Sequence, residues 1–476
     1  MRPWYQKNIT LSQFWQSIWH INFNQRYSIK DAYVRYQFKD SGKKTNSAGY
    51  TSPDQPLITT IPACSNPHSA EYPDEFIGGN AIPFPAAELN NQIKRGISFK
   101  DYAPFVIWNQ LDDDIKSLCS QDAYTQLMYL EALEAMKASG AQRTWIYNYG
   151  PWNDSQADVW EVDQSNYQIP NQYLEYVVEQ ASNLGIEVFF AWQFSNYDLS
   201  GEVFLQQSEE VTQETLTKIL DAHQRNMIAQ AKFAQKIGMA GISADWNAFD
   251  IVLTTDELKD YYLARFSDII DDIRANFSGQ ITWGQIGRIY NDERIFSKID
   301  SLLVNALWIG EAGGTFSQQE NANLTTELIK QKTLKYLQQE KSNIYCLDTG
   351  QSCWAGTSSI DLPAIISVQV QSREDYFING WKEDGFCTSG TLEDNTPDDC
   401  MQEHYTTDFS LQALGIEGIM QALSEQYTFS VESTDIHTGY WLSQTLTPGV
   451  EGFPNLSQSI RGKPAEHIVK YWYTGQ

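Results

Sequence analysis

Residues 216–246 read LTKILDAHQRNMIAQAKFAQKIGMAGISADW, and this stretch decides the fold. Its first part places apolar residues at helical spacing along one face, which predicts an amphipathic helix. His223 falls on the same face, so we expect it to be a packing residue. Gly238 then provides a common helix stop, and residues 239–245 predict a short buried strand. The stretch is therefore a helix that turns directly into a strand.

The order of helix, glycine and strand occurs four times. We expect the helices near residues 127–138, 174–184, 216–234 and 263–277, and the strands after them at 143–148, 186–192, 239–245 and 280–283. Further strand candidates are residues 96–100, 302–308, 343–347 and 434–441. Helices that alternate with short buried strands indicate parallel βα units of the α/β class. Eight such units over about 375 residues favour a (β/α)8 TIM barrel over a doubly wound sheet.

Two segments fall outside the repeating units. Residues 1–92 are rich in Asn, Ser, Pro and aromatic residues, and we expect an N-terminal extension that packs on a barrel of residues 93–476. Residues 355–408 form a large insertion between the seventh predicted strand and its helix. Active sites of such barrels lie at the carboxyl ends of the strands, so this insertion belongs to the functional face.

Three carboxylates stand at or just after predicted strands. Asp245 ends the fourth strand, Glu311 follows the sixth and Asp348 ends the seventh. Paired carboxylates at this end of a barrel provide general acid–base and nucleophilic chemistry. A single acidic residue at a strand end can also cap the next helix, so each of the three has a structural alternative.

Aromatic and amide side chains surround these carboxylates in the predicted barrel. The chain has 15 Trp, 26 Tyr and 22 Phe, which is more than a core needs. Flat rings stack on sugar faces, and amides bond to hydroxyl groups, so we expect a carbohydrate-binding site. The candidate binding residues at strand ends are Trp145, Asn148, Trp192, Gln193, Asn196, Trp246, Asn247, Trp283, His437 and Trp441.

The sequence argues against several other classes of protein. Its 33 basic and 60 acidic side chains give a net charge of −27, which disfavours a nucleic-acid partner. No apolar stretch approaches the roughly 20 residues of a membrane span. Dinucleotide, P-loop, α/β-hydrolase and zincin motifs are absent, and no second histidine stands at ligand spacing from His437, so we expect no metal and no cofactor.

Six cysteines are present without CxxC spacing. Cys387 and Cys400 bracket a loop that contains Gly, Asp and Pro, and they are either a disulfide or two free thiols. A disulfide implies an oxidising compartment, so we expect a secreted or periplasmic protein whose signal is missing from this sequence.

The layout resembles the (β/α)8 glycoside hydrolases related to the family-113 β-mannanases. The resemblance rests on Arg95-Gly-Ile-Ser-Phe and on residues 228–246, 343–352 and 459–473, which include Arg-Gly-Lys-Pro-Ala-Glu. It implies an acid/base residue on strand four, at Asp245, and a nucleophile on strand seven, at Asp348. The family has glutamate at both positions, and this chain has aspartate.

These observations predict a glycoside hydrolase that cleaves a polysaccharide or oligosaccharide with Asp245 and Asp348. One alternative is an α-glycan or fucan-type hydrolase with Asp245 as nucleophile and Glu311 as acid/base. Another is a non-catalytic carbohydrate-binding barrel, because a change from Glu to Asp at both positions can mark lost catalysis.

Overall fold

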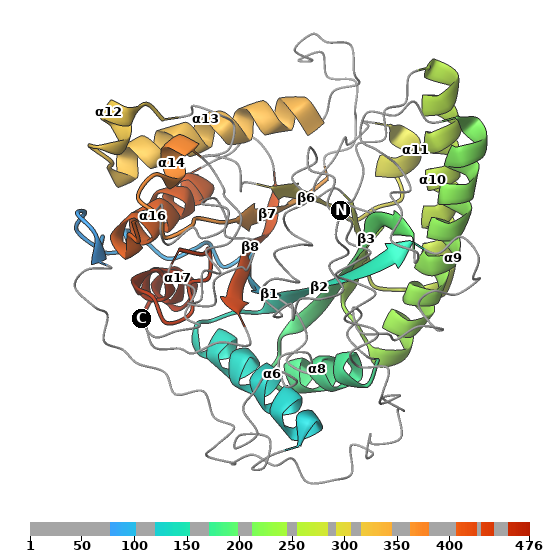
Figure 1. The fold of residues 1–476 in the computed structure, drawn as a ribbon, viewed down its shortest axis with the longest axis horizontal. Helices are drawn as coiled ribbons and strands as arrows, with labels where there is room; N and C mark the ends of the chain where they lie inside the picture. The colour runs from blue at the N-terminus through green and yellow to red at the C-terminus, as the bar shows by residue number, and fades with distance from the viewer. Residues whose placement is uncertain are drawn as a thin grey trace, which may run out of the picture.

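The computed structural model describes residues 77–100, 120–152, 171–198, 212–244, 255–283, 292–305, 316–344, 362–379, 406–425, 430–441 and 456–476. In these residues, eight parallel strands close into a barrel in sequence order, and helices surround it (Figure 1). The strands are β1 (Lys94–Lys100), β2 (Arg143–Trp152), β3 (Glu187–Asp198), β4 (Gly241–Ser243), β5 (Gln280–Trp283), β6 (Ser301–Asn305), β7 (Ala364–Val368) and β8 (Val431–Trp441). The predicted (β/α)8 TIM barrel is confirmed.

The helices follow the strands along the chain. Those between β1 and β6 are α6 (Gln121–Ala138), α8 (Asn171–Asn183), α9 (Gln213–Ile237), α10 (Asp256–Asn276) and α11 (Glu293–Phe296). Those after β6 are α12 (Gln318–Asn321), α13 (Thr326–Ile344), α14 (Tyr376–Asn379), α16 (Phe409–Glu425) and α17 (Pro464–Thr474). None of the helices in the described ranges is both long and apolar enough to cross a bilayer.

The glycine stops explain why most of the barrel is readable from the sequence. Helix α9 (Gln213–Ile237) is preceded by Thr212, whose side chain accepts a hydrogen bond from the backbone N–H of Thr215, and is followed by Gly238. Gly238 has φ of +81°, a left-handed conformation that glycine adopts without strain. The four predicted helices before β2, β3, β4 and β5 are all present, each with somewhat different ends.

The predicted seventh strand at residues 343–347 is wrong. Helix α13 continues to Ile344, and β7 is Ala364–Val368. No glycine occurs in α13, so nothing stops the helix where the short β-rich run begins. A large insertion does follow strand seven, but it comprises residues 369–408, because β7 itself lies inside the predicted range of 355–408.

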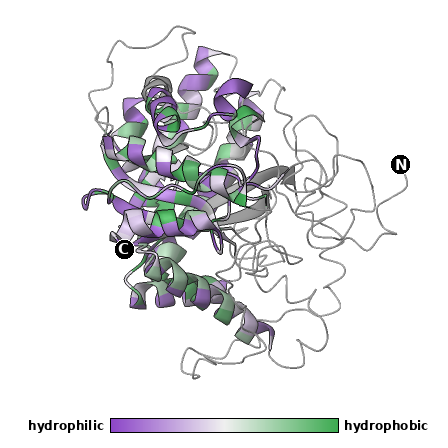
Figure 2. Cartoon of the chain, turned by 90° about the vertical axis from the view of Figure 1, so that its left-hand side faces the viewer, coloured by the Kyte–Doolittle hydropathy of each residue, from purple (hydrophilic) through white to green (hydrophobic). Residues whose placement is uncertain are grey.

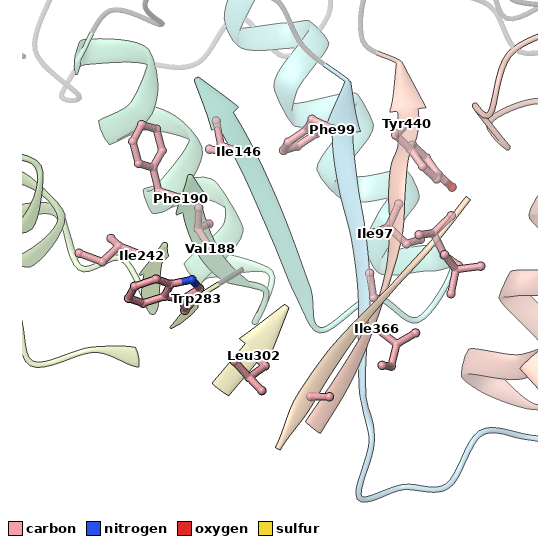
Figure 3. Close-up of a cluster of buried hydrophobic side chains, with 14 of the residues drawn as sticks. Ile97, Phe99, Ile146, Val188, Phe190, Ile242, Trp283, Leu302, Ile366 and Tyr440 are labelled. Atoms are coloured by element: carbon pink, nitrogen blue, oxygen red, sulfur yellow. The ribbon is translucent and has the colours of Figure 1, made fainter. Parts of the chain in front are cut away.

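Apolar side chains pack in two separate places. The larger cluster fills the layer between the barrel and its helices, and it takes alternate residues from each strand, such as Ile97, Phe99 and Ile366 (Figure 3). The smaller cluster lies inside the barrel and contains Trp145, Phe189, Ala191, Leu303 and Ile365. Hydrophilic and hydrophobic residues are interspersed along the outer helices, as expected for helices with one face in water (Figure 2).

The described end of the predicted N-terminal extension contacts the last two helices. The backbone N–H of Ala86 donates to Glu417 on α16 at 2.8 Å, and that of Leu89 donates to the carbonyl of Trp472 on α17 at 2.8 Å. Leu89 is itself buried. Residues 77–92 therefore pack on the barrel, and the role of residues 1–92 as one extension stays a prediction. All six cysteines, including Cys387 and Cys400, lie outside the described residues.

Candidate functional site

The inward-facing residues of strand β8 are polar, and their chemical groups differ from one end of the strand to the other. Thr434 and Ile436 face outward, since Thr434 bonds to Tyr473 on α17 at 2.8 Å and Ile436 belongs to the outer cluster. Side chains alternate along a strand, so Ser433, Asp435 and His437 face the interior. The inward residues of β8 thus progress from a hydroxyl to a carboxylate and an imidazole toward the carboxyl end.

Asp435 is a buried carboxylate that sequence reasoning missed. Its side chain has no exposed surface, and one oxygen accepts a hydrogen bond from Ser98 Oγ of β1 at 3.2 Å. The same oxygen lies 3.6 Å from Nδ1 of His437, whose side chain is 13% exposed. The period of two could have identified Asp435, because it stands two residues before His437 on the same face.

The amino end of the barrel interior is closed by an ionic cluster. Arg143, at the start of β2, donates to Glu187 Oε2 of β3 at 3.0 Å, to Gln280 of β5 at 3.1 Å and to Ser433 of β8 at 3.1 Å. Burial alone would raise the pKa of Glu187, but hydrogen bonds and positive charge from Lys94 and Arg143 lower it below its ordinary value. Side chains that bond to one another therefore fill this end of the barrel, and active sites of TIM barrels lie at the other end.

Asp245 comes directly after the last described residue of the β4 segment, Ala244. The Ala244 N–H donates to the carbonyl of Thr282 on β5 at 2.9 Å, and its carbonyl accepts from His223 of α9 at 3.0 Å. Asp245, Trp246 and Asn247 themselves lie outside the described residues. In chain order they belong to the connection from β4 to α10.

The other two candidate carboxylates also lie outside the described residues, but their connections differ. Glu311 follows β6 and precedes α12 in the chain. Asp348 follows α13 and precedes β7, in a connection that enters the amino end of a strand. The prediction that Asp348 ends strand seven is therefore wrong, because strand seven begins at Ala364.

The residues that do stand at the end of β7 are neutral. Ser367 faces inward, since it pairs with Asp435 while Ile366 packs in the outer cluster. Gln369 and Gln371 follow it at the same spacing of two, and both are buried. The described residues at and just after the end of β7 therefore offer a hydroxyl group and two amides, and no carboxylate.

Two of the predicted sugar-stacking tryptophans belong to the core instead. Trp145 is fully buried in the inner cluster, where its ring lies 4.9 Å from that of Phe189. Trp283 is 3% exposed and faces outward, with its ring 4.6 Å from Phe266 of α10, and Figure 3 shows it in the outer cluster. The alternation of faces identifies Trp283 as a core residue, whereas Trp145 faces inward and is identified as a core residue by its burial.

The backbones of the remaining candidates are placed in strands. Asn148 of β2 pairs with Trp192 of β3, and Gln193 and Asn196 follow in the same strand. Trp441 is the last residue of β8 and pairs with Lys100. The side chains of these residues are not among those the structure describes, so their contacts with a ligand stay a prediction.

The Arg461-Gly-Lys463 segment fixes the start of the insertion after β7. Lys463 is buried, and its ammonium donates to Ser372 Oγ at 2.9 Å and to the carbonyl of Ser457 at 2.9 Å. Burial lowers the pKa of Lys463 well below its ordinary value. The chain that leaves β7 is therefore attached to the last helical unit before it reaches α16.

Among the residues described, no group of three or more His, Cys, Asp or Glu side chains is arranged to hold a metal ion. The site that the described residues support is an inner surface of serine, glutamine, aspartate and histidine, without a ligand cage.

No protein-family model and no curated protein matches the chain. Among solved structures, it is similar to a family-113 β-1,4-mannanase, with 12% identity, a TM-score of 0.48 and coverage of 81% of this chain and 100% of that one. It is also similar to a family-113 β-mannanase from Alicyclobacillus acidocaldarius, with 12% identity, a TM-score of 0.48 and coverage of 80% of this chain and 97% of that one. A rutinosidase from Aspergillus niger has 10% identity to the chain and a TM-score of 0.41, with coverage of 80% of this chain and 98% of that one. These likenesses concern the fold alone, a TIM barrel similar to those of glycoside hydrolases.

Proposed function

We propose that the chain is a glycoside hydrolase that acts on a polysaccharide or oligosaccharide, with Asp245 and Glu311 as its two carboxylates. The observation that carries this proposal is the connectivity: Asp245 follows β4 and Glu311 follows β6, whereas Asp348 precedes β7. Residues after strands gather at the carboxyl end of a TIM barrel, where catalytic groups occur. Because β7 begins at Ala364, after Asp348, its position favours Glu311 over Asp348 as the partner of Asp245.

The inner surface at this end suits a hydroxylated ligand. Asp435, His437 and Ser98 come together in the barrel interior, and they offer a carboxylate, an imidazole and a hydroxyl. Such groups donate to and accept from sugar hydroxyls. In the proposed reaction Asp245 is the nucleophile and Glu311 the acid/base group, which protonates the leaving oxygen and then activates water.

A second candidate function follows from the end of β7. Ser367 of β7 and the buried Gln369 and Gln371 that follow the strand provide a hydroxyl group and two amides, and no carboxylate. Amides bind sugars without cleaving them, so this observation favours a carbohydrate-binding barrel that does not catalyse hydrolysis.

The experiment that separates the two functions is incubation with a panel of plant and algal polysaccharides, with released products identified by mass. Binding to the same panel is measured in parallel by calorimetry. Product release that is lost in Asp245→Asn and Glu311→Gln supports the hydrolase. Binding without product release in the parent protein supports the binding barrel, and neither binding nor release contradicts both.

A further inference from the structure

His223 makes a hydrogen bond that a packing residue does not need. It lies on α9, and its Nε2 is 3.0 Å from the carbonyl oxygen of Ala244, at the end of β4. A carbonyl only accepts hydrogen bonds, so Nε2 carries the proton in this contact. The side chain is fully buried, and its ring lies 5.3 Å from that of Phe266 on α10. The imidazole therefore connects the helix layer to the end of one strand.

This bond acts where the strand ladder ends. The pairing of β4 with β5 runs from Gly241 to Ser243, and the Ala244 N–H adds one more bond, to Thr282 at 2.9 Å. The Ala244 carbonyl then takes its hydrogen bond from a side chain of α9. Both polar groups of Ala244 are thus held, one by the sheet and the other by the helix.

Planarity of the peptide transmits this constraint to the next residue. The carbonyl of one residue and the Cα of the following residue belong to one rigid plane. A hydrogen bond that fixes the Ala244 carbonyl therefore fixes the direction in which the chain enters position 245. That position is Asp245, the candidate nucleophile.

We propose that His223 is a positioning residue for Asp245, acting through the carbonyl of Ala244 and without contact to substrate. The inference rests on the proposed function, because it concerns the orientation of the same carboxylate. Small displacements of a reacting group cost large factors in rate, so a strand end held on two sides is an advantage to catalysis. Burial lowers the pKa of His223 to about 4, which keeps the ring neutral at ordinary pH and preserves a single N–H for this bond.

Two substitutions and a matched control separate positioning from packing. His223→Leu removes the donor and keeps apolar bulk, whereas His223→Gln retains an N–H at similar reach. Asn226→Leu is the control, because Asn226 lies one turn further along α9, is also buried, and its Nδ2 has no hydrogen-bond partner among the described residues. All three changes are at buried polar positions of one helix.

Hydrogen exchange of residues 241–245 tests the geometry independently of activity. We expect His223→Leu to accelerate exchange there by roughly tenfold or more, while His223→Gln and Asn226→Leu stay near the parent rate. Equal exchange in His223→Leu and the parent protein would overturn the inference.

Kinetics on the substrate found in the polysaccharide panel test the consequence. We expect His223→Leu to lower kcat about tenfold with KM within about twofold, and His223→Gln to restore most of kcat. Full kcat in His223→Leu, together with loss of turnover in Asp245→Asn, would contradict the inference alone. Retained turnover in Asp245→Asn would contradict the proposed function and the catalytic purpose of His223 with it.

Discussion

Nη1 of Arg143 lies 2.9 Å from Oε1 of Glu432 at the amino end of the barrel, and the same guanidinium lies 4.0 Å from the ring of Phe189. Arg143 is 1% exposed, so this contact joins an ionic cluster to the apolar interior above it. The pair closes the end of the barrel that is opposite to the proposed site.

The first prediction concerns this closure. Arg143→Met leaves Glu187 and Glu432 without their shared partner, so we expect the free energy of unfolding to fall by about 3 kcal/mol in urea titrations. Lys218→Met is the control, because Lys218 pairs with Glu214 on an exposed face, where the loss should stay below about 0.5 kcal/mol. Equal losses in the two variants would show that the cluster does not stabilise the barrel.

The second prediction concerns the reassigned tryptophan. Trp283→Leu removes the contact with Phe266 in the outer cluster, and we expect the free energy of unfolding to fall by about 2–4 kcal/mol. Thermal or denaturant unfolding measures this loss. If Trp283→Leu left the free energy of unfolding unchanged but weakened sugar binding, Trp283 would be a ligand-binding residue and not a core residue.

The third prediction concerns the pH dependence of stability through His223. Burial lowers its pKa from 6.5 to about 4, so the unfolded chain binds the proton more readily than the folded protein. The contribution of His223 to stability is complete above pH 6.5 and is lost as the pH falls toward 4. We expect up to about 3 kcal/mol of this loss in the parent protein and none of it in His223→Gln.

Parallel denaturant titrations of the parent protein and His223→Gln between pH 7 and pH 4 measure the difference. If the difference in unfolding free energy between them does not change with pH, the histidine does not titrate as described.

The fourth prediction concerns the connection between β7 and α16, which contains Cys387 and Cys400. We propose that these cysteines form a disulfide and that the protein works in an oxidising compartment outside the cytoplasm. Such a loop would stabilise the fold by about 2–3 kcal/mol if it is unstrained. Peptide mapping without reductant should find one crosslinked peptide pair, and two alkylated thiols would contradict both proposals.

The sequence was informative wherever a helix ended at a glycine. Gly140, Gly185 and Gly238 all have positive φ, and each separates a predicted helix from a strand that the structure contains. Helix α13 has no such stop, and the seventh strand was misplaced for that reason. Because of that error Asp348 was expected at the end of strand seven, whereas it follows α13 and precedes β7 in the chain.

The candidate site was less predictable than the fold, because residue type does not reveal which face of a strand a side chain occupies. Trp283 and His437 both stand on predicted strands, yet one packs against α10 and the other faces the interior. Asp435 lies within a strand, so its position in the sequence does not mark it as a strand-end carboxylate. The alternation of Asp435 with Ile436 carries the information that identifies it.

The most direct test of the proposed catalytic pair compares turnover in three variants of the protein on the substrate identified from the panel. Asp245→Asn and Glu311→Gln change charge with little change in volume, and we expect each to lower kcat by at least about 10³-fold with unchanged melting temperature. Asp348→Asn should keep near-parent kcat, since Asp348 belongs to the connection that precedes β7. Loss of turnover in Asp348→Asn, with activity retained in Glu311→Gln, would contradict the assignment of the catalytic pair.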